Sequence, residues 1–181
     1  MELLPSELSI FYLIRTAWIY KDFNSERMYN SVIFYDKDRI ENLGIQFRNA
    51  IEKAQMNGER DEINYFRNFP RGCCGDTCDL LSHYLLKNGI STRYVCGTFY
   101  GKTTDKFQSH AWLLYKDRVI IDITGDQFKY DVDFLYYNKC VYVGTKNDFY
   151  KLFDIEPRDI RNYIGLDARQ RCLYSTISQY F

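Results

Sequence analysis

Three residues that lie far apart in the sequence have the side chains that nucleophilic acyl transfer requires: Cys74, His110 and Asp122. This chemistry needs a thiolate to attack a carbonyl carbon, an imidazole to take up and return a proton, and a third polar group to orient the imidazole. The chain has only 2 His, so the imidazole must come from His83 or His110. The sequence therefore predicts a Cys74, His110 and Asp122 triad, provided that the fold brings these residues together.

The thiol of Cys74 stands where a helix is predicted to begin. Residues 69–72 form a Phe-Pro-Arg-Gly turn just before it, and Asn88-Gly89 is a typical stop signal for a helix. Unpaired backbone N–H groups and the positive end of the helix dipole favour a thiolate at such a position. The apolar stripe of the helix continues through Cys78, Leu81 and Leu85, so the sulfur should lie at the head of the face that packs into the core.

His110 and Asp122 lie on two predicted strands, residues 109–114 and 118–124, joined by a polar turn. With a three-residue loop over residues 115–117, Leu114 pairs with Arg118 and Trp112 with Ile120. His110 then stands directly opposite Asp122, with Cβ atoms about 5 Å apart. A two-residue loop would put the two side chains on opposite faces, so an odd-numbered loop or a bulge is a condition of the function. In that register the other face is apolar, which predicts a sheet covered on both sides: Ala111, Leu113, Val119, Ile121 and Ile123.

The rest of the chain supplies helices and a few strands around this core. Apolar spacing predicts helices over residues 6–20, 38–57 and 158–179, and a short helix over 147–153. Residues 92–99 and 140–143 are further predicted strands. These elements indicate an α+β fold in a single domain over residues 1–181, in which a nucleophile helix packs on an antiparallel sheet of about four strands, with helices at both ends.

Five short runs occur in a distinctive order: Cys74-Gly-Asp-Thr-Cys, Gly89-Ile, Arg93-Tyr-Val-Cys-Gly, His110-Ala-Trp and Ile121-Asp-Ile-Thr. Together, over about residues 69–128, they resemble the core of transglutaminase-like cysteine enzymes of the papain-like superfamily. The resemblance implies a papain-like fold with Cys74 as nucleophile, His110 as general base and acid, and Asp122 as the orienting group. One departure is that this chain has Arg118 and Val119 where the family often has a Trp.

The resemblance also implies a reaction at an amide carbonyl through a thioester, without a cofactor. Members of this family include proteases, amidases, glutamine deamidases and transglutaminases, so the reaction type is better defined than the substrate. Deamidation or transfer at protein glutamine, as in a toxin domain, is the first alternative. A catalytically silent interaction module is the second, and a thioester-forming acetyltransferase is the third.

Several residues have competing interpretations. Cys73 lies about 100° around the helix from the apolar stripe and is therefore a weaker nucleophile candidate. Asp126 is an alternative orienting group, although a turn residue is its expected role. The backbone N–H of Cys74 is the natural oxyanion donor, with Asn64 or Gln127 as a second donor.

A zinc site built from cysteines and His83 is disfavoured by geometry. His83 is nine residues from Cys74 and so about 180° around the helix, and it is expected to be a half-exposed surface residue. No metal or other cofactor is therefore expected.

Composition narrows the class of partner. The 24 basic and 24 acidic residues balance, so no global charge favours nucleic acid or anionic lipid. No run reaches the roughly 18 apolar residues of a membrane span, and a signal peptide is not expected. We expect a cytoplasmic protein, or one delivered to a target cytoplasm if it is a toxin domain. Its expected partners are a protein or peptide substrate and a possible inhibitor or immunity protein.

Overall fold

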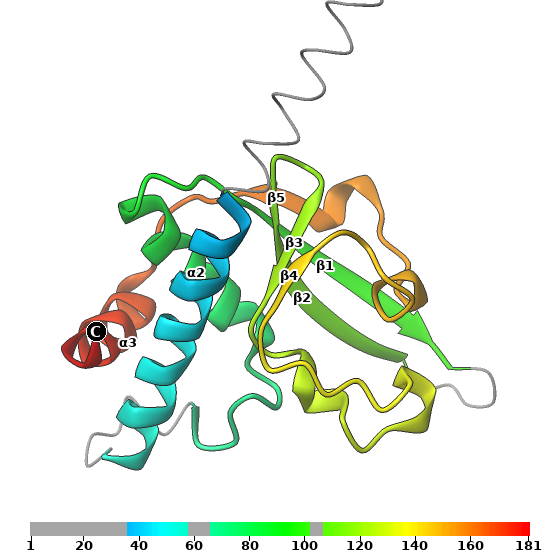
Figure 1. Cartoon of the computed structure of the whole chain (residues 1–181), viewed down its shortest axis with the longest axis horizontal. Coiled ribbons are helices and arrows are strands. Elements are labelled where there is room, and N and C mark those ends of the chain that lie inside the picture. Colours follow the sequence, from blue (N-terminus) through cyan, green and yellow to red (C-terminus); the bar gives the residue numbers. More distant parts are fainter. Residues whose placement is uncertain (1–35, 58–65, 102–106) are drawn as a thin grey trace, which may run out of the picture. The chain divides into compact units, whose positions relative to one another are not determined.

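A computed structural model describes residues 36–57, 66–101 and 107–181 (Figure 1). Residues Arg39–Phe181 form one compact unit. The helix expected over residues 6–20 lies outside the described residues. The assignment of residues 1–181 to a single domain therefore stays a prediction.

Three α-helices are described. The first covers residues 36–56, close to the predicted 38–57. α2 (Cys74–Lys87) begins at the predicted residue, and Gly89 follows its end with a φ of +78°, a conformation that favours glycine. α3 (Ala168–Ile177) begins with a capping box, in which the side chains of Asp167 and Gln170 each accept the other's backbone N–H. The predicted start and end of α2 are therefore confirmed.

Five strands form one antiparallel sheet in the order β4-β3-β2-β1-β5. They are β1 (Arg93–Tyr100), β2 (Phe107–Tyr115), β3 (Val119–Asp122), β4 (Tyr142–Gly144) and β5 (Ile160–Asn162). β1, β2 and β3 follow the predicted strands, with ends that differ by one or two residues. The α+β class, with helices on an antiparallel sheet, is confirmed.

Both faces of the sheet are covered, as the strand pattern predicts. α2 packs against β1 and β2, and Figure 1 shows the helices on one side of the sheet and the segment around residues 150–159 on the other. Ala111, Leu113 and Ile121 are buried on the helix side. The other side holds a buried cluster that is mostly aromatic: Val95, Trp112, Ile120, Phe128, Phe134, Phe149, Tyr150 and Phe153.

The register between β2 and β3 differs from the prediction. The loop has three residues, as expected, but Tyr115 pairs with Val119 and Leu114 with Ile120. The reason lies in the turn, where Lys116 and Asp117 have φ values of +50° and +54° and Tyr115 remains in the strand. His110 and Asp122 keep the same face because the loop is odd-numbered. The prediction that the two residues stand directly opposite each other is wrong, because continuing the observed register places Asp122 opposite Trp112.

The helix predicted over residues 158–179 is wrong in its first half. Residues Pro157–Asp159 form a 3-10 turn, and β5 then pairs with β1 before the chain reaches α3. Pairing at the free edge of β1 outweighs the local helical pattern here, and Gly165, with a φ of +99°, separates β5 from α3. The short helix near 147–153 is the 3-10 helix η4 (Tyr150–Leu152).

Candidate active site

Two neighbouring cysteines at the start of α2 have different environments. Cys74 is the first residue of α2 and is partly exposed, whereas Cys73 is the N-cap residue and is buried. Burial alone would raise the pKa of Cys74, but a hydrogen bond with His110, the positive charge of His110 and the backbone N–H of Ala111 lower it below the ordinary value. Burial, with the nearby charge of Cys74, raises the pKa of Cys73 to about 12. Cys74 is therefore the thiol that favours the thiolate.

His110 is fully buried and lies between Cys74 and Asp122. Its Nε2 is 2.7 Å from Oδ2 of Asp122, and Cys74 lies near enough to affect the pKa of the imidazole. Burial lowers the pKa of His110, but the charge and hydrogen bond of Asp122, followed by those of Cys74, raise it to about 9. Because Nε2 faces Asp122, Nδ1 is the nitrogen left to exchange a proton with the thiol. Four aromatic rings surround the imidazole: Trp112, Phe128, Phe149 and Phe153.

Asp122 accepts hydrogen bonds from other donors besides His110. Its Oδ1 accepts the backbone N–H of Thr124 at 2.8 Å and the Thr124 hydroxyl at 3.0 Å. The Tyr150 hydroxyl donates to Oδ2 at 2.9 Å. Burial would raise the pKa of Asp122, but His110, Thr124 and Tyr150 together lower it. The carboxylate therefore stays charged in a buried position and can orient the imidazole.

Sequence analysis did not predict that Tyr150 and Thr124 would bind Asp122. A Thr two residues after an Asp is a recognisable turn pattern, in which the carboxylate accepts the Thr N–H. Tyr150 carries no such local signal, since it lies 28 residues beyond Asp122.

Gln127 borders the imidazole on the side that faces away from Asp122. Its Nε2 lies 3.1 Å from Nδ1 of His110 and donates to the Thr124 carbonyl at 3.1 Å. An amide at this distance from Nδ1 stands close to where a reacting carbonyl must sit. Of the two side chains considered as second oxyanion donors, Gln127 thus lies beside the imidazole, and Asn64 lies outside the described residues.

Asp126 is an ion-pair partner rather than an orienting group for His110. Both of its carboxylate oxygens bind the guanidinium of Arg48, at 2.7 and 3.0 Å. Arg48 also donates to the carbonyls of Ile123 and Cys140 and pairs with Glu52. This buried ion pair fastens the helix over residues 36–56 to the segment that follows β3. The idea of Asp126 as a simple turn residue is therefore incomplete, because its partner lies 78 residues away.

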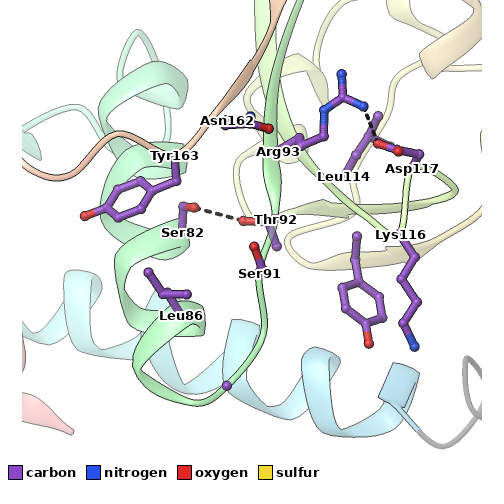
Figure 2. A pocket seen from close by; sticks show the side chains of 12 residues that line it. Ser82, Leu86, Ser91, Thr92, Arg93, Leu114, Lys116, Asp117, Asn162 and Tyr163 are labelled. Atoms are coloured by element: carbon purple, nitrogen blue, oxygen red, sulfur yellow. Dashed lines mark hydrogen bonds and ion pairs between the residues drawn. The ribbon is translucent and has the colours of Figure 1, made fainter.

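Of two pockets formed by the described residues, the second adjoins the residues around His110. The first, of about 520 Å³, lies between the C-terminal half of α2, the start of β1 and the β2–β3 turn (Figure 2). Its polar walls are internally paired, as Ser82 bonds Thr92 at 2.9 Å and Arg93 bonds Asp117 at 2.6 Å. The second, of about 490 Å³, is here named the Phe128 pocket and is lined by Arg71, Gln108, Gln127, Phe128, Tyr130, Asp131 and Val132.

His83 is a half-buried residue away from the proposed triad. Its Nδ1 lies 2.7 Å from the Tyr163 hydroxyl, and its ring meets the edge of Tyr174 at 4.6 Å. Burial lowers its pKa. Within residues 36–57, 66–101 and 107–181, no three His, Cys, Asp or Glu side chains are grouped so as to hold a metal ion. Within the same residues, no helix is long and apolar enough to cross a membrane.

Comparison with known families agrees with the fold. Residues 35–128 match the family model of the transglutaminase-like superfamily, which is just over half of the 181 residues. The chain therefore belongs to the transglutaminase-like superfamily, and the family expectation from the sequence is confirmed. No curated protein and no solved structure matches the chain.

Proposed function

We propose that this chain is a cysteine-dependent enzyme that hydrolyses or transfers acyl groups at an amide bond through a thioester. The observation that carries the proposal is the buried His110, which hydrogen-bonds Asp122 at 2.7 Å through Nε2 and lies near enough to Cys74 for each to shift the pKa of the other. Burying an imidazole and a carboxylate is costly without a compensating role. Perturbed pKa values of this kind are typical of catalytic groups.

In the proposed reaction, the sulfur of Cys74 attacks the carbonyl carbon and a C–S bond forms. The backbone N–H of Cys74, which has no partner within the helix at this position, donates to the oxygen that becomes negative. His110 then gives its proton to the leaving nitrogen, and the C–N bond breaks. Water or an amine attacks the thioester in the second half, with His110 accepting its proton, and Cys74 is released.

Asp122 acts on the imidazole rather than on the substrate in this proposal. It accepts a hydrogen bond from the Nε2–H of His110 and stabilises the positive charge that the imidazole carries while both of its nitrogens are protonated. The reduced thiol that the reaction needs is available, since all six cysteines are free. We propose a reducing compartment such as the cytoplasm as the place of action. A protein or peptide is the proposed substrate.

The first test is the reactivity of Cys74. Under limiting iodoacetamide at pH 6.5, we expect Cys74 to be alkylated faster than the exposed Cys172, as measured by peptide mass spectrometry. In the His110→Ala variant, alkylation of Cys74 should be slower and the alkylation rate of Cys172 should be unchanged. Equal rates at Cys74 and Cys172 in the unsubstituted chain would instead favour the silent interaction module.

The second test identifies the reaction. The protein is incubated with a proteome, and Cys74→Ser and Cys73→Ser serve as the inactive and matched control variants. New peptide termini indicate hydrolysis of the backbone, a mass increase of about one unit at glutamine indicates deamidation, and crosslinks indicate transfer. Deamidation or transfer at protein glutamine remains the second candidate, because the chain belongs to the transglutaminase-like superfamily. All changes should depend on Cys74 and not on Cys73.

A further inference from the structure

The Phe128 pocket adjoins the proposed catalytic groups on two of its walls. The Phe128 ring lies edge-on to the His110 ring at 5.1 Å, and Gln127 reaches Nδ1 of His110. Arg71, which also lines the pocket, precedes Cys74 by three residues in the sequence. Adjacent residues of an extended peptide are about 3.3–3.6 Å apart along the chain. A peptide whose amide sits between Cys74 and His110 would therefore bring a neighbouring side chain to this pocket.

We infer that the Phe128 pocket binds the side chain next to the reacting amide in a peptide or protein substrate, and that it selects a large, uncharged, apolar side chain. The inference rests on the proposed function and names its substrate class. A volume of about 490 Å³ suits such a side chain together with part of the peptide backbone.

The charges of the pocket walls favour an uncharged occupant. Arg71 and Asp131 both line it, so a substrate side chain of either sign meets a like charge as well as an opposite one. A charged side chain would also lose hydration on entry. The side-chain amides of Gln108 and Gln127 offer both donors and acceptors, which suits the N–H and C=O groups of a peptide backbone.

The segment that contributes Tyr130 and Val132 to the pocket exposes further apolar side chains. Tyr130 is 74% exposed and Val132 is 63% exposed, and Leu135 and Tyr136 follow at 59% each. Clusters of exposed apolar side chains commonly mark binding surfaces. A surface of this kind fits an apolar stretch of a protein chain better than it fits a small polar amide.

The segment that carries these side chains is internally braced. Asp131 accepts the backbone N–H of Asp133 at 3.0 Å through its side chain and that of Tyr136 at 3.0 Å through its carbonyl. Phe134 between them is fully buried in the aromatic cluster. Apolar side chains on such a fixed backbone present a preformed surface, which lowers the entropic cost of binding.

The test compares peptides that differ only in the residue next to the reacting amide. We expect the unsubstituted protein to prefer Leu or Phe over Asp or Lys there by about 10-fold or more in kcat/KM, because a charged side chain loses hydration on entry and meets a like charge in the pocket. Val132→Asp should remove most of this preference. Ile164→Asp is the matched control, because Ile164 is 86% exposed and is not among the residues that line the pocket.

Two outcomes would overturn the inference while leaving the proposed function intact. One is equal turnover of the Leu, Asp and Lys peptides, and the other is the same effect from Val132→Asp as from Ile164→Asp. A separate binding assay with the Cys74→Ala protein detects the pocket without turnover. If that protein binds apolar peptides through Val132 but the unsubstituted protein converts none of them, the pocket assignment stands and the proposed function fails.

Discussion

Two buried carboxylates stand four residues apart at the end of β3, and they have different kinds of partner. Asp122 binds an imidazole, whereas Asp126 binds the guanidinium of Arg48. An imidazole can gain and lose a proton near neutral pH, but a guanidinium stays charged at all ordinary pH values. The first pair can therefore move a proton, and the second can only hold two segments together. The comparison indicates that burial and ion pairing alone do not mark a catalytic carboxylate, because the partner's ability to titrate decides the role.

The largest effect that we expect is on turnover, from Asp122→Asn. The variant keeps the shape of the side chain but cannot hold His110 in its present tautomer and charge state, so kcat/KM should fall by about 10³–10⁴-fold. Steady-state kinetics on any substrate found by the proteome screen would measure this. Asp126→Asn in the folded protein should retain more activity than Asp122→Asn by at least 10-fold. Equal losses would contradict the division of roles between the two carboxylates.

The second effect is on stability, where Asp126→Asn should be more harmful than Asp122→Asn. Asp126→Asn should lower the free energy of unfolding by about 3–5 kcal/mol, because it removes the buried carboxylate that pairs with Arg48 and leaves Arg48 with the more exposed Glu52. Asp122→Asn should cost less, because His110 can lose its proton and become neutral. Denaturant unfolding of both variants measures the difference. A smaller loss for Asp126→Asn than for Asp122→Asn would show that the Arg48 pair does not fasten the fold as we describe.

Sequence analysis could predict the features of this region that depend on short sequence patterns. The start of α2 at Cys74, its end before Gly89 and the shared face of His110 and Asp122 all follow from turn residues and strand alternation. The loop between β2 and β3 was predicted one residue too early, so Leu114 pairs with Ile120 rather than with Arg118, because Lys116 and Asp117 adopt positive φ without being glycine. That deviation left the face of both side chains unchanged.

The parts that sequence analysis missed depend on contacts between distant residues. Arg48 meets Asp126 from 78 residues away, and Tyr150 meets Asp122 from 28 residues away. β5 forms because β1 offers it a free edge, and not because residues 160–162 have a strong strand pattern of their own. Such partners are selected by the assembled fold, so no local pattern in the chain identifies them.

The third prediction uses pH to separate the two ion pairs. The pKa of His110 is raised to about 9 from an ordinary value near 6.5. The protonated imidazole therefore stabilises the fold. This contribution is complete below about pH 6.5 and is lost as the pH rises to about 9. The unsubstituted protein should therefore lose stability relative to His110→Gln as the pH rises through that window. The corresponding difference for Arg48→Met should stay flat there, because burial would lower the pKa of Arg48 but the hydrogen bond and charge of Asp126 raise it above its ordinary value, which already lies outside this window.

Thermal or urea unfolding at several pH values between 6 and 10 would measure both differences. The comparison uses differences between variants because other groups also contribute in this range, including thiols such as Cys96 and Cys140, whose pKa values are raised in the fold by burial. A flat difference for His110→Gln would mean that the imidazole is not charged in the folded protein. The buried pair would then be a neutral hydrogen bond.

The smallest expected effect comes from Tyr150→Phe, which tests whether Tyr150 positions the imidazole through Asp122. The variant keeps the ring among Trp112, Tyr137 and Tyr142 but removes the hydroxyl that donates to Asp122. With one donor fewer, the carboxylate attracts the His110 proton more strongly, so the pKa of His110 should rise further. The pH profile of kcat/KM should shift with it, while KM changes little.

Stability should fall by about 1 kcal/mol, the usual net value of one hydrogen bond. Tyr142→Phe is the matched control, since its hydroxyl donates to the Thr145 carbonyl and does not contact Asp122. A merely structural tyrosine would lower stability without moving the pH profile. A shift in Tyr150→Phe that is absent in Tyr142→Phe would therefore extend the proton-handling side of the comparison to a fourth residue, which lies outside the part of the chain that matches the family model.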